Sequence, residues 1–290
     1  TDKQWKELAI GMNWTATRMN INTLERHKVF TDPEVTEFIA TKLSDPQEVR
    51  DAKVFPYQLM QAYLMTETAP MKIRLALQTA METAIERVPA LLGKVHVAVD
   101  TSGSMSQAIT GNRGSVTSKT RCIDVAALFA ASVMRKNPEA QIWPFDTSVH
   151  RHDLNPLDSV ITNGAKLAGF GGGGTDCHLV LRHLNQGHIP GDAVIYISDN
   201  ESWADPNRWR RGAALMEQWK IFKSRNPSAK LICIDLSPNT TSQASQGKEI
   251  LNIGGWSDQC FTTIAEFLSG SSEGATNDKW LADIEAIVVD

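Results

Sequence analysis

Oxygen-bearing side chains gather at three places in the second part of the sequence. The first is the turn 100–104, with the sequence DTSGS; the second is Thr175, which follows a run of four glycines; the third is Asp199. They offer carboxylates and hydroxyls without sulfur or imidazole, a donor set that suits Mg²⁺ or Mn²⁺, which prefer six oxygens in near-octahedral geometry. We predict that one such cation is held by Asp100, Ser102, Ser104, Thr175 and Asp199.

The balance of charge in this donor set predicts what the cation does. If the serine hydroxyls bind the metal directly and the carboxylates act partly through water, the metal keeps much of its positive charge. It would then attract an acidic ligand from outside the chain, either a carboxylate or a phosphate. This division between direct and water-mediated ligands is a hypothesis.

The elements around these residues indicate how they are positioned. Short apolar runs at 95–99, 193–197 and 231–234, with a weaker one at 140–145, alternate with helical patterns, a pattern typical of a doubly wound, mostly parallel α/β sheet. The helical patterns cover residues 123–136, 177–185, 213–224 and 260–269. Asp100 and Asp199 each end a strand, so both should open onto the carboxyl edge, where such sheets bind ligands. We assign this α/β domain to residues 93–290.

The first 90 residues have a helical pattern instead. The segments TDPE (31–34) and SDPQ (44–47) each combine a capping residue with a proline suited to a first helical turn. An apolar stripe that includes Met71 then indicates a longer helix ending near Pro89. Short helices at tight spacing predict a HEAT-like α-helical segment over residues 1–90. The chain begins at Thr1 inside a helical pattern, which is typical of a piece of a longer protein.

Composition narrows the class of protein. The chain has 290 residues, 42% hydrophobic and 21% charged, which is enough for two regions with a buried core. A net charge of −4 argues against coating nucleic acid through bulk positive charge, although a local basic face remains compatible with it. The four cysteines form no CxxC pair, so we expect free buried thiols rather than a disulfide or a zinc site. With no signal peptide and no membrane-spanning apolar run, we expect a cytoplasmic protein without membrane contact.

The metal turn and its partners carry a resemblance to a known family. The D-x-S-x-S turn after a strand, Thr175 after glycines and the strand-final Asp199 resemble the metal-ion-dependent adhesion site of von Willebrand factor A domains. The segments AVDTSGSM (98–105), GGTDC (173–177) and SDNES (198–202) together resemble the A domain of the Ro autoantigen family. Upstream, MNINTLERH (19–27) and AKVFPY (52–57) resemble the last part of the TROVE module of that family.

This resemblance implies a function in RNA binding. In the Ro family a ring of HEAT-like repeats, closed by the A domain, binds small noncoding RNAs on its outside and takes single-stranded ends of misfolded RNA into its hole. Only about 90 residues of helical module are present here. Basic residues that could contact RNA phosphates are Arg18, Arg26, His27 and Lys28 in the helical part, and Arg208, Arg210 and Arg211 beside Trp209. A plain solvated surface is the alternative for both groups.

We do not expect an enzyme. No histidine accompanies the D-x-S-x-S turn, and Asp176, the one candidate base, is expected to cap the helix that follows it. The segment 107–119, rich in Gly, Ser and Thr, is a candidate recognition loop or mobile filler. We therefore expect a non-catalytic, Ro-like ribonucleoprotein component with Mg²⁺ or Mn²⁺ as cofactor. The alternative is an adhesion-type A domain that binds an acidic residue of a protein partner, without an RNA role.

Overall fold

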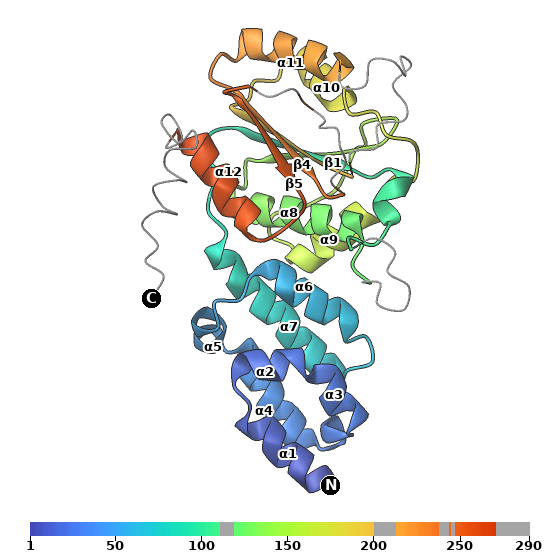
Figure 1. Cartoon of the computed structure of the whole chain (residues 1–290), viewed down its shortest axis with the longest axis vertical. Coiled ribbons are helices and arrows are strands. Elements are labelled where there is room, and N and C mark those ends of the chain that lie inside the picture. The colour runs from blue at the N-terminus through green and yellow to red at the C-terminus, as the bar shows by residue number, and fades with distance from the viewer. Residues whose placement is uncertain (111–118, 200–212, 238–243, 245–246, 271–290) are drawn as a thin grey trace, which may run out of the picture.

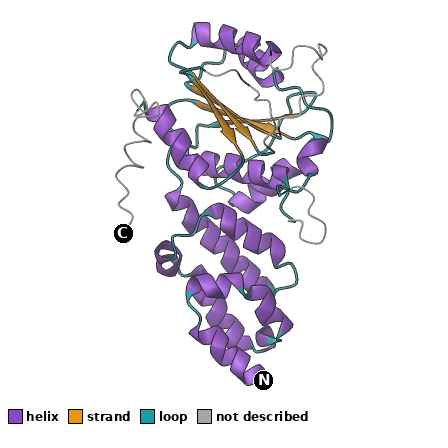
Figure 2. Ribbon diagram, viewed as in Figure 1, coloured by secondary structure: helices purple, strands orange, loops and turns teal. Residues whose placement is uncertain are grey.

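The computed structural model describes residues 1–110, 119–199, 213–237, 244 and 247–270, and all structural statements below refer to these residues. A stack of short helices forms one end of the molecule, and a sheet layered between helices forms the other (Figures 1 and 2). The helical stack consists of α1 (Asp2–Gly11), α2 (Trp14–Met19), α3 (Ile21–Arg26), α4 (Pro33–Ser44), α5 (Pro46–Asp51), α6 (Pro56–Met65) and α7 (Met71–Ala84).

Helices α4 and α5 start at the two predicted segments, TDPE (31–34) and SDPQ (44–47), and in each the aspartate is the capping residue. The Asp32 side chain accepts hydrogen bonds from the N–H groups of Glu34 and Val35, and Asp45 repeats this arrangement one helix later. The proline at the first turn of each helix has no N–H to leave unsatisfied. Helices α4 and α7 then pack on each other through buried aliphatic side chains such as Ile39 and Leu77.

The second region contains a parallel sheet. Its strands are β1 (Val95–Asp100), β2 (Gln141–Phe145), β3 (Ala193–Ser198), β4 (Lys230–Asp235) and β5 (Ile250–Gly254). Within the described part of the chain they pair in the order β2-β1-β3-β4-β5, and every pairing is parallel. This confirms the predicted α/β fold class. The four runs that form β1 to β4 were expected. Strand β5 was not, because its half-buried sequence ILNIG is interrupted by a polar residue.

Helices cover both faces of the sheet (Figure 2). On the face toward the helical stack lie α8 (Cys122–Lys136), α9 (Val160–Ala168) and α12 (Gln259–Ser269), and on the other face lie α10 (Leu179–Gln186) and α11 (Ala213–Arg225). Alternate residues of β1 face opposite sides of the sheet. Val97 packs in the apolar core that includes α8, and Ala98 packs in the apolar core that includes α10. Each central strand is buried on both sides, which explains its unbroken apolar sequence.

The helical stack and the sheet domain share one core. The apolar cluster that begins at Ala9 in α1 continues without a break to Ile264 in α12. Polar contacts also connect the helical stack to the sheet domain, at an interface that we call the joint. Glu82 of α7 accepts from Arg135 of α8 at 2.5 Å and from the backbone N–H of Val160, the first residue of α9, at 2.8 Å. This joint therefore fixes the helical segment against the helices under the sheet.

A second polar contact caps α6 from the sheet domain. The backbone N–H of Tyr57, in the first turn of α6, donates to the carboxylate of Asp258 just before α12. The Tyr57 ring packs edge-on against Trp256 in the same place. Burial raises the pKa of Asp258 to about 6, while the hydrogen bond from Tyr57 opposes that rise. The carboxyl thus sits in a site that disfavours its charged form.

Two further expectations concern the cysteines and the membrane. All four cysteines are free and buried, which confirms the prediction of unpaired thiols. None of the helices in the described ranges has the length and hydropathy needed to cross a bilayer.

Candidate metal centre

The turn that follows β1 holds Asp100 in a fixed orientation. Its side chain is fully buried, and both carboxylate oxygens are engaged. Oδ1 accepts from the backbone N–H of Ser102 at 2.8 Å, and Oδ2 accepts from the hydroxyl of Ser198 at 2.6 Å. Because Ser198 ends the neighbouring strand β3, the sheet itself sets the position of this carboxylate.

The two serines of the turn present their hydroxyls together. Ser102 Oγ and Ser104 Oγ lie 3.1 Å apart, with Ser102 just before and Ser104 within the short 3₁₀ helix Gly103–Ser106. In an octahedral Mg²⁺ site with ligands at about 2.1 Å, neighbouring oxygens lie roughly 3 Å apart. The spacing of the serine oxygens therefore fits two adjacent ligand positions around a single Mg²⁺.

The glycine-rich segment lies directly against this turn. The N–H of Gly172 donates to the carbonyl of Thr101, and the N–H of Gly103 donates to the carbonyl of Gly173, both at 2.9 Å. Gly171 has a φ of +76°, and a Cβ there would lie 2.1 Å from the carbonyl oxygen of Thr101. Only glycine allows this approach, which brings the buried Thr175 to the same edge of the sheet as the serines.

Asp199 completes the group at the end of β3. It is fully buried, and the side-chain amide of Gln107 donates to its Oδ2 at 3.2 Å. Burial raises the pKa of Asp100 to about 6, and the negative charge of Asp199 contributes to this rise. Two buried carboxylates therefore lie close enough to repel each other, an arrangement that a bound cation would relieve. The structure brings the five predicted residues to one rim; that they bind a metal stays a prediction.

Sequence reasoning missed Asp146, which follows β2. This buried carboxylate accepts from the N–H of Ser148 at 3.0 Å and from the N–H of Gly173 at 3.3 Å, and it pairs with His150 at 2.9 Å. Although burial acts in the opposite direction, these contacts hold the pKa of Asp146 below its usual range. Asp146 thus anchors the glycine-rich segment. Its signal, an acid directly after a strand, is the one that identified Asp100.

Other groups near the rim do not offer alternative ligands. Burial, reinforced by the charge of Asp199, raises the pKa of the Cys122 thiol to about 12, so it stays protonated at neutral pH. Within the described ranges no three His, Cys, Asp or Glu side chains converge as a metal site of their own. The expectation that Asp176 caps the next helix is wrong. His178 is the N-cap of α10, and the Asp176 carboxylate pairs with the His178 ring instead.

The predicted RNA-contact residues of the helical part differ in exposure. Arg26, His27 and Lys28 are all exposed. The His27 ring stacks on Trp5, with ring centroids 3.9 Å apart. Arg18 is half-buried and donates to the carbonyl of Gln58, and burial lowers its pKa. Arg18 is thus engaged within the stack, while Arg26 and Lys28 reach solvent. The remaining predicted residues, Arg208, Arg210 and Arg211, lie outside the described residues.

The structure adds a basic residue near Arg26. Lys119, at the end of the segment considered as a recognition loop, pairs with Glu67 of the α6–α7 turn at 3.4 Å. Lys119, Glu67, Arg26 and Glu25 all line one shallow hollow of about 280 Å³. Lys119 therefore meets the helical stack at a hollow lined by two basic and two acidic side chains.

Comparison with known proteins agrees with this architecture. A parallel sheet between helices, with a D-x-S-x-S turn at its carboxyl edge, defines residues 95–269 as a von Willebrand factor A-type domain. Residues 94–268, more than half of the chain, match the family model described as the Ro60 vWA domain. The chain therefore belongs to the Ro60 vWA domain family, which confirms the resemblance to the Ro autoantigen family.

A solved structure extends the similarity to the helical segment. The crystal structure of the Ro (RSR) protein of Deinococcus radiodurans matches 90% of this chain with a TM-score of 0.71, at 21% sequence identity. This match shows that the helical segment and the A domain together have the fold of the matching part of that Ro protein. The chain spans 53% of the length of that protein. No curated protein sequence matches the chain.

Proposed function

We propose that the rim formed by Asp100, Ser102, Ser104, Thr175 and Asp199 holds one divalent cation, Mg²⁺ or Mn²⁺, and presents it to an acidic group of a ligand. The observation that carries this proposal is the pair of serine hydroxyls 3.1 Å apart beside two buried carboxylates. Both hydroxyls can serve as neutral direct ligands, so the ion would keep enough charge to attract a carboxylate or a phosphate.

We further propose that the chain is a non-catalytic, Ro-like component of a ribonucleoprotein that binds small noncoding or misfolded RNA. Membership of the Ro60 vWA domain family supports this role. Arg26 and Lys28 are exposed, and Arg26 lines one hollow with the loop residue Lys119, so basic side chains are available to phosphates on a chain of net charge −4. Such side chains would bind phosphates with a strong dependence on salt. Four buried free thiols agree with a reducing compartment such as the cytoplasm.

The metal is tested by the double variant Ser102→Ala, Ser104→Ala. We expect the wild-type melting temperature to rise with added Mg²⁺, since a ligand that binds only the folded state stabilises it. The variant should fold but show no such rise. A melting temperature of the variant that still rises with Mg²⁺ would place the ion elsewhere.

RNA binding is tested separately, with a fluorescently labelled RNA hairpin that carries a single-stranded 3′ tail. Binding should weaken steeply with KCl and persist in EDTA, because phosphate contacts would come from basic side chains and not from the metal. The double variant Arg26→Ala, Lys28→Ala should weaken binding about tenfold. Its charge-matched control is Arg151→Ala, Lys248→Ala, at exposed sites of the A domain. Equal losses in both variants would reject this surface.

The protein-binding alternative gives the opposite pattern. An adhesion-type A domain would bind a protein partner only while the metal is present, and RNA would have no specific site. Loss of all ligand binding in EDTA, with RNA binding absent at physiological salt, would support that alternative over the Ro-like role.

A further inference from the structure

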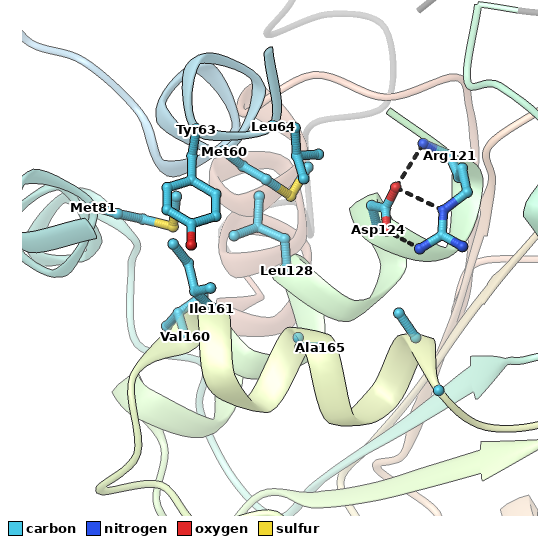
Figure 3. A pocket seen from close by; sticks show the side chains of 13 residues that line it. Met60, Tyr63, Leu64, Met81, Arg121, Asp124, Leu128, Val160, Ile161 and Ala165 are labelled. Atoms are coloured by element: carbon cyan, nitrogen blue, oxygen red, sulfur yellow. Dashed lines mark hydrogen bonds and ion pairs between the residues drawn. The ribbon is translucent and has the colours of Figure 1, made fainter. Parts of the chain in front are cut away.

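A cavity lies at the joint between the helical stack and the A domain. It has a volume of about 410 Å³, and helices α6, α7, α8 and α9 all contribute to its wall (Figure 3). Met60, Tyr63, Met81, Leu128 and Ile161 line it. A volume of this order, at an interface between two folding units, is typical of small-molecule binding pockets.

The chemistry of the wall selects against charged ligands. Most of the lining is aliphatic carbon and thioether sulfur, so an ion placed there would lose its hydration without compensation. The charged lining residues are Arg121 and Asp124, which bind each other through two hydrogen bonds of 2.7 and 3.1 Å. This pair carries no net charge. The Tyr63 hydroxyl, which points into the cavity in Figure 3, can offer a ligand one hydrogen bond.

A glycine keeps the cavity open. Gly164 lies in the middle of α9, where glycine is among the least favourable residues for a helix. A Cβ at this position would meet no atom within 4 Å, so close packing does not require glycine there. Gly164 also lines the cavity. Gly164 therefore lowers the stability of α9 at a position where a larger side chain would fill the cavity. Such a local cost to stability is expected at a binding site.

We propose that this cavity binds an uncharged, largely apolar small molecule. Such a ligand would contact the methionines of α6 and α7 and the aliphatic side chains of α8 and α9 at the same time. Its binding free energy would then strengthen the joint between the helical stack and the A domain. The flexible side chains of Met60 and Met81 can adapt to ligands of different shape. This inference does not depend on the metal or on RNA.

The experiment uses N-phenyl-1-naphthylamine, an uncharged fluorescent molecule, with the whole chain. We expect a saturable rise in its fluorescence with a Kd on the order of 10 μM, in the range of apolar ligands of this size. The variant Gly164→Leu should bind at least tenfold more weakly while melting at the same temperature as the wild type or higher. The matched control is Gly11→Leu at the end of α1, where a Cβ also meets no atom within 4 Å; it should bind like the wild type.

Competition tests the predicted preference for neutral ligands. 1-Octanol should displace the dye, and octanoate at the same concentration should not. The proposal is overturned if the wild type shows no saturable binding, if Gly164→Leu binds like the wild type, or if octanoate competes as well as octanol. It is also overturned if the wild type is a dimer that Gly164→Leu converts to a monomer, because the cavity would then receive a second copy of the chain.

Discussion

The rim of the sheet and the joint beneath it are built in opposite ways. At the rim, each polar side chain follows the end of its own strand or lies in a turn fixed by backbone hydrogen bonds, and the residues that meet there are buried acids and hydroxyls. At the joint, the wall of the cavity comes mainly from four helices and is mostly apolar. At the rim, the end of a strand or a turn therefore places each side chain, whereas the joint depends on how whole helices pack on one another.

This difference predicts that the rim and the joint can be disrupted independently, and the largest effect is expected at the rim. Asp100→Asn should lower the affinity for Mg²⁺ by about 100-fold, or roughly 3 kcal/mol, because one of the two carboxylate charges is lost. The matched control is Asp235→Asn, a strand-final acid of β4 outside the predicted site. Titration calorimetry with Mg²⁺ measures both. Equal losses would mean that the ion responds to net charge and not to the predicted turn.

At the joint, Leu128→Ala should lower the free energy of unfolding by about 2 kcal/mol and leave Mg²⁺ affinity unchanged. Leu128 is 2% exposed and lines the cavity, so its truncation removes apolar contacts between α8 and the helical stack. Leu75→Ala is the control, since that leucine is 54% exposed and should change stability by less than about 0.5 kcal/mol. Urea denaturation gives both values. A change in Mg²⁺ affinity in Leu128→Ala would show that the rim and the joint are coupled.

A smaller effect is expected from the polar contact of the joint. Glu82→Gln keeps an acceptor for the N–H of Val160 but loses the ion pair with Arg135, so we expect a loss of about 1 kcal/mol. The exposed pair of Glu37 with Lys72 provides the control, and Glu37→Gln should change stability by at most about 0.5 kcal/mol. If urea denaturation shows the same loss of stability in both variants, the partial burial of the Glu82–Arg135 pair does not strengthen it.

An effect of similar size, but of opposite sign and dependent on pH, is expected at Asp258. Burial raises the pKa of Asp258 to about 6, above its value of about 4 in the unfolded chain. The folded state then binds more protons between these two values, so the contribution of Asp258 to stability falls as pH rises from 4 to 6. Asp258→Asn, which can still accept from Tyr57, should therefore be more stable than the wild type at pH 7.5 by about 1 kcal/mol.

Urea denaturation at pH 4 and pH 7.5 measures this difference. The gain should be largely lost at pH 4, where the wild-type carboxyl is protonated in the folded state and about half protonated in the unfolded chain. A gain of equal size at both values would mean that packing, and not the charge of Asp258, is responsible.

The contrast between rim and joint also explains what the sequence could predict. Asp100 and Asp199 end apolar runs that are buried on both faces, so their strands and their meeting at one edge were predictable. Asp146 obeys the same rule, but its strand begins with the exposed Gln141 and contains Pro144, which weakened the signal. An acid at the end of a strand was thus predictable as a rim residue only where the strand had an unbroken apolar sequence.

Features that depend on distant segments left no such signal. Helix α9 was not predicted, since its short sequence contains Gly164 and Asn163 within a nine-residue helix. The cavity beside it needs the packing of α6 and α7 on α8 and α9, which no local pattern encodes. The approach of Lys119 to Glu67 likewise joins residues 52 positions apart. Local spacing predicts which residues share an edge, but not which helices leave space between them.

The most direct test of the metal centre is a crystal of the whole chain soaked in Mn²⁺ and measured for anomalous scattering. One strong peak should lie within about 2.3 Å of both Ser102 Oγ and Ser104 Oγ, between the carboxylates of Asp100 and Asp199. A crystal that diffracts well but shows no peak at this rim, or shows its strongest peak elsewhere on the chain, would contradict the assignment.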